Sequence, residues 1–210
     1  MIIKEKLIYK DALNNEFEGV IAWDDSYTEQ KPGILVSHMW SGQAEFEVQK
    51  AEALAKLGYV GFAIDNYGKG RRANGPEEAQ KLMDELDQNR PLLLSRMLLA
   101  VDTLKKHKMV NASKIGAIGF CFGGKCVLDL ARSGSDIKGV VSFHGLLDPP
   151  NPHPNKKIKS AILVLHGWED PMALPDDMVK LSQEMNGLAA DWSVHVYGRT
   201  GHAFTNPKAK

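Results

Sequence analysis

The chain has 210 residues, of which 43% are apolar and 25% are charged, and it carries 26 basic and 26 acidic side chains. This length and composition predict one globular domain over residues 1–210, with enough apolar side chains for a substantial core. The balanced charge gives no field that would attract nucleic acid or an acidic membrane, so neither is expected as a partner.

The sequence carries no mark of export, membrane insertion or disulfide bonding. No apolar run is long enough to span a bilayer, and the start, Met-Ile-Ile-Lys-Glu-Lys, lacks the apolar stretch of a signal peptide. Cys121 and Cys126 are the only cysteines, and their spacing across a turn is unfavourable for a mutual disulfide. We therefore expect a cytoplasmic protein in a reducing compartment, and a monomer.

In chain order, the elements begin with two β-like runs, Ile2–Tyr9 and Phe17–Trp23, that flank Asn14-Asn15 and predict an antiparallel hairpin. Six apolar runs follow that are typical of strands buried on both faces: Gly33–Ser37, Tyr59–Ile64, Lys114–Phe120, Gly139–Phe143, Ala161–His166 and Trp192–Val196. Between them lie four helical stretches: Glu45–Leu57, Glu77–Lys106, Lys125–Arg132 and Asp176–Leu188.

This alternation predicts an α/β fold with an eight-stranded, mostly parallel sheet and helices on both faces. Pro91 should divide the long second helical stretch into two helices, because proline disrupts a helix interior. The proline-rich segment 149–154 is expected to be a surface loop rather than a domain linker, since strands and helices resume after it.

The most informative motif is Gly119-Phe120-Cys121-Phe122-Gly123, which follows an apolar run and precedes a helical stretch. This pattern is typical of a nucleophile elbow, a sharp strand-to-helix turn, with cysteine where serine is usual. A thiolate at a helix N-terminus is stabilised by the helix dipole and by free N–H groups. An isolated intracellular cysteine is most often a buried packing residue, but the glycine frame favours Cys121 as a nucleophile.

A nucleophilic thiol needs a proton acceptor and a group that orients the acceptor. His202 lies in a glycine-flanked loop after the last predicted strand, and Asp170 lies in the loop that leaves the preceding strand. The chain order of nucleophile, acid and histidine is that of the α/β hydrolases. Because loops at the carboxyl ends of parallel strands meet, Cys121, Asp170 and His202 are predicted to converge as a catalytic triad, with Glu169 as the alternative acid.

Stabilising a tetrahedral oxyanion requires two N–H donors. One should be the backbone N–H of Phe122, and the other should come from the loop after the first central strand, Ser37-His38-Met39-Trp40-Ser41-Gly42. We assign the second donor to the Trp40 N–H.

The elbow cysteine, the acid loop His166-Gly167-Trp168-Glu169-Asp170-Pro171 and the histidine loop Gly201-His202-Ala203-Phe204 together resemble the dienelactone hydrolase family of α/β hydrolases. The similarity runs over nearly the whole chain, including Gly58-Tyr59-Val60 and the segment Asp65-Asn66-Tyr67-Gly68 that follows it. The resemblance implies hydrolysis of a small ester or lactone by a Cys-His-Asp triad, with no metal and no cofactor.

Two positions depart from the family pattern. The family's founding enzymes have a glutamate, which helps control the ionisation of the thiol, at the position of Met39, and a carboxylate-binding arginine at the position of Asn206. Both departures weaken the case for a dienelactone as the substrate. The chain also ends eight residues after His202, where relatives usually continue into a closing helix.

Five further residues are candidates for the substrate pocket. His38, Met39 and His144 fall at predicted strand ends, and Arg71 and Arg72 could attract an anionic substrate, although a solvated charged turn is the commoner explanation. The strand-end histidines, His38, His144 and His166, lack a spacing that would indicate a metal site.

Two other functions remain open on the sequence. One is a non-catalytic member of the fold, in which the elbow thiol serves as a redox or ligand-contact site. The other is a thioesterase or peptidase on the same scaffold.

Overall fold

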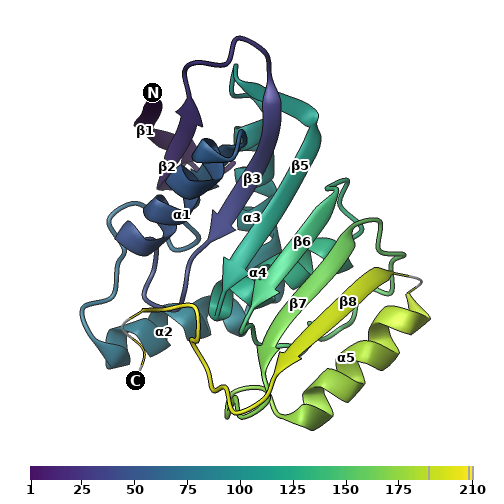
Figure 1. The fold of residues 1–210 in the computed structure, drawn as a ribbon. Helices are drawn as coiled ribbons and strands as arrows, with labels where there is room; N and C mark the ends of the chain where they lie inside the picture. The colour runs from purple at the N-terminus through teal and green to yellow at the C-terminus, as the bar shows by residue number, and fades with distance from the viewer. Residues whose placement is uncertain (189, 208, 210) are drawn as a thin grey trace.

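Within residues 1–188, 190–207 and 209, which the computed structural model describes, eight strands form one sheet in the order β1-β2-β4-β3-β5-β6-β7-β8 (Figure 1). β1 pairs with β2 and β2 with β4 in antiparallel fashion, and all other pairs are parallel. The strands are β1 Ile2–Lys10, β2 Glu16–Asp24, β3 Lys31–Ser37, β4 Val60–Ala63, β5 Val110–Phe120, β6 Gly139–Phe143, β7 Ala161–Gly167 and β8 Asp191–Tyr197.

The helices lie on both faces of this sheet. α1 packs on the face of β2, β3 and β4, where small residues such as Ala51 and Ala55 meet the sheet. α3 and α4 pack on the opposite face, and the buried residues of α5 belong to the same apolar cluster as theirs (Figure 1). The bounds are α1 Glu45–Lys56, α2 Pro76–Asp87, α3 Arg90–Lys105, α4 Phe122–Arg132 and α5 Pro175–Gly187. The predicted α/β architecture is confirmed.

The long helical stretch divides where Gln88 and Asn89 stand, slightly before the predicted break at Pro91. The Asn89 side chain accepts a hydrogen bond from the Leu92 N–H at 3.1 Å and so caps α3. Pro91 lies in the first turn of α3, where a missing N–H has no cost. The proline therefore begins a helix rather than bending one.

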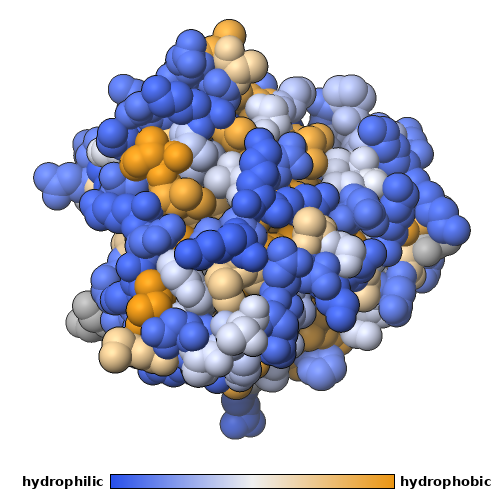
Figure 2. All heavy atoms as spheres, turned by 90° about the horizontal axis from the view of Figure 1, so that it is seen from above, coloured by the Kyte–Doolittle hydropathy of each residue, from blue (hydrophilic) through white to orange (hydrophobic). Residues whose placement is uncertain are grey.

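All the parallel strands end at the same edge of the sheet. In Figure 1 the arrowheads of β3 and of β5 to β8 point the same way, and the segment after β8 turns back along this edge towards α2. The opposite end, where these strands begin, is mainly hydrophilic with small separate hydrophobic areas (Figure 2). No helix in the described part of the chain is long and apolar enough to cross a bilayer.

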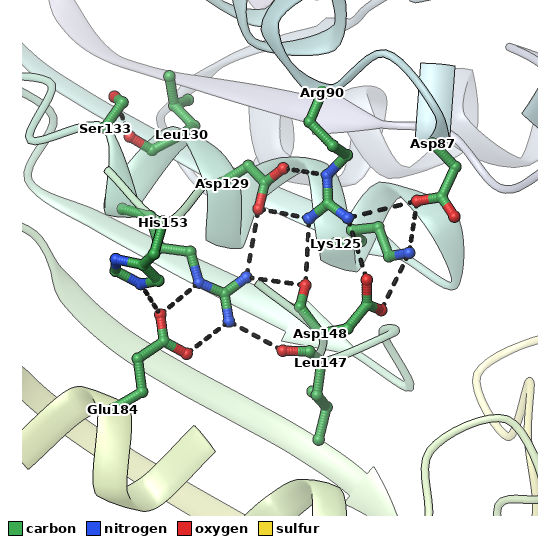
Figure 3. A network of polar contacts seen from close by, with 11 residues as sticks. Asp87, Arg90, Lys125, Asp129, Leu130, Ser133, Leu147, Asp148, His153 and Glu184 are labelled. Atoms are coloured by element: carbon green, nitrogen blue, oxygen red, sulfur yellow. Dashed lines mark hydrogen bonds and ion pairs between the residues drawn. The ribbon is translucent and has the colours of Figure 1, made fainter. Parts of the chain in front are cut away.

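A network of charged side chains joins α4 to the α2–α3 junction, the loop after β6 and α5 (Figure 3). Asp129 on α4 accepts hydrogen bonds from Arg90 at 2.6 and 2.7 Å and from Arg132 at 3.2 Å. Arg132 is fully buried and also pairs with Glu184 of α5 at 2.7 Å. The remaining members are Asp87, Lys125, Asp148 and His153. Arg90, Lys125, Asp129 and Arg132 are buried, whereas the side chain of Asp148 is 59% exposed. Each buried charge stabilises the fold only while its partners are present.

We predict that Asp129→Ala lowers the free energy of unfolding by about 3–5 kcal/mol, because it leaves two buried guanidinium groups without their shared carboxylate. Urea unfolding followed by circular dichroism would measure the change. Asp136→Ala is the matched control, since Asp136 is 75% exposed and pairs with Lys138 at 3.8 Å; its effect should be below about 0.5 kcal/mol. Equal effects of the two substitutions would contradict the prediction.

Candidate active site

Cys121 stands at a sharp turn between the end of β5 and the first residue of α4, Phe122. Its backbone has φ 55° and ψ −118°, a conformation that costs about 1–3 kcal/mol for a residue with a side chain. The turn is held by hydrogen bonds from the Cys121 N–H to the Phe143 carbonyl at 3.0 Å and from the Gly124 N–H to the Cys121 carbonyl at 2.9 Å. The surrounding contacts therefore fix a strained residue at the carboxyl edge of the sheet.

The two glycines that frame Cys121 are required by close backbone approach. A Cβ atom at Gly119 would lie 1.9 Å from the Gly123 carbonyl oxygen, where strand and helix cross. A Cβ atom at Gly123 would lie 2.3 Å from the Ser37 carbonyl oxygen and 2.7 Å from that of His38. The first turn of α4 thus lies directly against the end of β3, as the elbow motif predicts.

His202 and Asp170 meet at the same edge. The Asp170 Oδ2 atom lies 2.8 Å from His202 Nδ1, and Asp170 Oδ1 accepts a hydrogen bond from the Met172 N–H at 2.9 Å. Asp170 is buried, whereas the alternative acid Glu169 is exposed. A carboxylate can only accept, so Nδ1 carries the proton and Nε2 faces away from Asp170.

Cys121 also acts on His202. Burial opposes protonation of His202, but the hydrogen bond with Asp170 and the influence of the Cys121 sulfur outweigh it and raise the pKa of His202 to about 9. His202 Nε2 is buried and has no partner of ordinary hydrogen-bond geometry among the described residues. The sulfur and the imidazole are therefore adjacent without an aligned hydrogen bond, which is common in resting catalytic sites.

Two backbone N–H groups, those of Phe122 and Trp40, have no acceptor among the described residues. Phe122 is the first residue of α4, so its N–H has no acceptor within the helix. The Trp40 N–H lies in the loop after β3 and makes no hydrogen bond among the described residues. Since this loop contacts Gly123, both groups belong to one region of the molecule. They are the two N–H groups that we assign from the sequence to an oxyanion site, and that role stays a prediction.

His38 and Met39, predicted for the substrate pocket, lie in this loop but are engaged within the protein. His38 Nδ1 donates to the Met39 carbonyl at 2.6 Å, and His38 Nε2 accepts from the Asn66 N–H at 3.1 Å. Burial lowers the pKa of His38 to about 4, so the ring is neutral. Met39 is partly buried and packs against both apolar clusters. His38 therefore supports the loop and has no ring nitrogen left for a ligand.

Arg71 and Arg72 are each paired with a carboxylate. Arg71 Nη2 contacts both oxygens of Glu85 at 2.8 Å. Arg72 donates to Asp65 Oδ1 at 3.2 Å and to the Gln43 side chain at 3.0 Å. Both arginines thus have internal roles, so neither offers an unpaired charge to an anionic substrate.

His144 lies at the site, next to His202. The two rings are 5.0 Å apart in an edge-on arrangement, and His144 Nε2 lies 2.7 Å from the Thr205 hydroxyl. Burial and the positive charge of His202 lower the pKa of His144 to about 4. His144 Nδ1 is buried and has no partner among the described residues. A neutral ring therefore forms one wall beside the imidazole of His202.

Two residues that sequence reasoning did not single out also belong to this region. The Tyr67 hydroxyl donates to the Trp40 carbonyl at 2.8 Å, and its ring stacks on that of Phe122 at 6.1 Å. Glu47, on α1, is fully buried and accepts a hydrogen bond from the Met39 N–H at 3.3 Å. In the sequence, Glu47 was marked only by its position in the first turn of a predicted helix.

The histidines at strand ends all have protein partners. His166 Nε2 donates to the Ala173 carbonyl at 2.9 Å within the acid loop, and the partners of His38 and His144 are given above. Within the described ranges, no group of three or more histidine, cysteine or acidic side chains is arranged to hold a metal ion.

An eight-stranded, mostly parallel sheet with a strand–turn–helix elbow and a histidine–aspartate pair at its carboxyl edge defines an α/β-hydrolase fold. Residues 17–210 match the model of the dienelactone hydrolase family. The chain belongs to this family and is a dienelactone hydrolase-like hydrolase.

Individual relatives agree with this assignment. "Protein usf" of Aquifex pyrophilus is 31% identical over 84% of this chain and 78% of its own length. A putative carboxymethylenebutenolidase of Aquifex aeolicus is 30% identical over the same shares of the two chains. The crystal structure of a dienelactone hydrolase-like promiscuous phosphotriesterase from metagenomic libraries superposes with a TM-score of 0.93 at 30% identity, covering 98% of this chain and 85% of the other.

We predict that the His202 imidazole keeps its proton up to a pH of about 9, against an ordinary value of 6.5. The raised pKa stabilises the folded state fully below pH 6.5, and this contribution is lost as the pH rises through 9. Asp170→Asn removes the carboxylate that raises the pKa most, so the titration should move to lower pH. NMR titration of the imidazole signals would measure both midpoints, and an unchanged midpoint in the variant would contradict the assignment.

Proposed function

We propose that the protein is a thiol-dependent hydrolase of small carboxylic esters or lactones, with Cys121 as nucleophile, His202 as base and Asp170 as the orienting acid. The observation that carries the proposal is the 2.8 Å contact between His202 Nδ1 and Asp170, with the same imidazole beside the strained Cys121. Asp170 holds the histidine in one tautomer and stabilises its cation.

In the first half of the reaction the Cys121 thiolate, whose proton has passed to His202, attacks the ester carbonyl. A carbon–sulfur bond forms, and the negative charge moves to the carbonyl oxygen, where the N–H groups of Trp40 and Phe122 donate to it. The intermediate then collapses with loss of the alcohol oxygen, which takes the proton from His202. The product of this half is a thioester on Cys121.

In the second half His202 removes a proton from a water molecule, which attacks the thioester carbon. Collapse of the second intermediate breaks the carbon–sulfur bond, releases the carboxylic acid and restores the thiolate and the protonated imidazole. No metal or cofactor takes part in either half of this scheme.

We propose further that the substrate is small and uncharged near its reacting bond. Arg71 and Arg72 are both paired with carboxylates. Asn206, at the position of the family's carboxylate-binding arginine, has an uncharged amide side chain. A substrate that carries a carboxylate would thus meet no unpaired guanidinium at these three positions.

We predict that Cys121→Ala lowers kcat for a short nitrophenyl ester by several orders of magnitude, as expected for loss of a triad nucleophile. Cys121→Ser should also be impaired, because a hydroxyl is a poorer nucleophile than a thiolate. Ester turnover in continuous assays, with circular dichroism to confirm folding, would check both. Near-normal turnover by the alanine variant would exclude the mechanism.

Two rival functions would give different results in related assays. A binding or redox-sensing protein would show slow alkylation of Cys121 by iodoacetamide at pH 6 and no turnover of any ester or lactone. A thioesterase or peptidase would use the same three residues, but it would prefer acyl thioesters or peptides in a substrate panel.

A further inference from the structure

The loop of residues 38–44, here called the oxyanion loop, is held by hydrogen bonds on both sides of the Trp40 N–H. The carbonyl of Met39 belongs to the same peptide group as this N–H, and it accepts hydrogen bonds from His38 Nδ1 at 2.6 Å and from the Gly42 N–H at 3.2 Å. In a trans peptide the carbonyl and the N–H point in opposite directions. Fixing the carbonyl therefore aims the Trp40 N–H.

The two neighbouring peptide groups are also held. The carbonyl of Trp40 accepts from the Tyr67 hydroxyl at 2.8 Å. The N–H of Met39, on the other side, donates to Glu47 Oε1 at 3.3 Å. The Trp40 N–H lies between these anchors and has no acceptor among the described residues. Each of three successive peptide planes thus has a partner, and the middle N–H remains available.

Glu47 is the anchor that brings a carboxylate into the interior. Its side chain comes from α1, is fully buried, and uses its second oxygen to accept the Ala44 N–H at 2.9 Å. Burial raises the pKa of Glu47, while the N–H groups of Ala44 and Met39 act in the opposite direction. Burying a carboxylate is costly unless it is hydrogen-bonded, and here its two hydrogen bonds come from the two ends of the oxyanion loop.

We propose that Glu47 is a positioning residue for catalysis, which holds the oxyanion loop so that the Trp40 N–H points at the developing oxyanion. This inference rests on the function proposed above. It assigns to Glu47 an effect on the transition state through Trp40, and no contact with the substrate or with Cys121.

A simpler role for Glu47 would be to cap α1, because it stands at the third position of that helix and accepts the N–H of the capping residue. The chain provides a matched control for this role. Asp177 stands at the third position of α5 and accepts the N–H of the capping residue Leu174 at 3.0 Å. Asp177 makes the cap contact without reaching the oxyanion loop.

The experiment compares Glu47→Ala with Asp177→Ala in three measurements on the full chain. These are kcat and KM for a short nitrophenyl ester, the rate of Cys121 alkylation by iodoacetamide, and the melting temperature. Alkylation requires the thiolate but no oxyanion site. It therefore distinguishes an effect on the thiol from an effect on the oxyanion donors. Loss of an oxyanion donor costs about 10²–10³ in kcat, and we expect a displaced donor to cost between about tenfold and a hundredfold.

Glu47→Ala should therefore lower kcat by about tenfold to a hundredfold. KM and the alkylation rate should stay within about threefold of wild type. Asp177→Ala should leave all three kinetic values unchanged, although both substitutions lower the melting temperature. Glu47→Gln, which keeps the volume and one acceptor oxygen, should give an intermediate kcat, and it replaces the alanine variant if that variant does not fold.

The inference is overturned if the substitutions at Glu47 lower kcat no more than Asp177→Ala does, or if they lower alkylation as much as kcat. If the wild-type protein hydrolyses the ester, either result leaves the proposed function intact. A wild-type protein that alkylates but hydrolyses no ester overturns both the function and the role of Glu47.

Discussion

The close crossing of β5, α4 and the end of β3 is the constraint on which the rest of the site depends. Gly119 and Gly123 have no room for a Cβ atom, because backbone oxygens of Gly123 and Ser37 occupy that space. This contact brings the loop after β3 against the first turn of α4. Without it, the N–H groups of Trp40 and Phe122, some eighty residues apart in the sequence, would not lie in one region of the molecule.

Beyond its first turn, α4 is held by ion pairs of its charged side chains. Lys125, Asp129 and Arg132 join α4 to α2, α3, α5 and the loop after β6 (Figure 3). The helix that begins after Cys121 is therefore held by backbone contact at its start and by ion pairs along its length. Such support matters because a catalytic group must be held to within a fraction of an ångström.

The sequence predicted the elements well, because they follow from local patterns, and the loops of Asp170 and His202 meet as their places after two neighbouring strands indicate. Strands showed as apolar runs, and Cys121, Asp170 and His202 lay at strand ends that a parallel sheet brings to one edge. The roles of Arg71, Arg72 and His38 were beyond the sequence, since each depends on a partner brought close only by the fold. Glu47 was missed because its hydrogen bond with the Met39 N–H depends on how the loop after β3 lies against α1.

The Trp40 N–H, which makes no hydrogen bond within the described part of the chain, also bears on how the proposed site could be inhibited. Small aldehydes add reversibly to thiols, and the hemithioacetal that results places an oxygen where the ester carbonyl oxygen would otherwise stand. Boronic acids would likewise present oxygens to the same donors. Inhibitors of this kind would bind through the backbone, so exchanging side chains around the rim would alter their selectivity more than their anchoring.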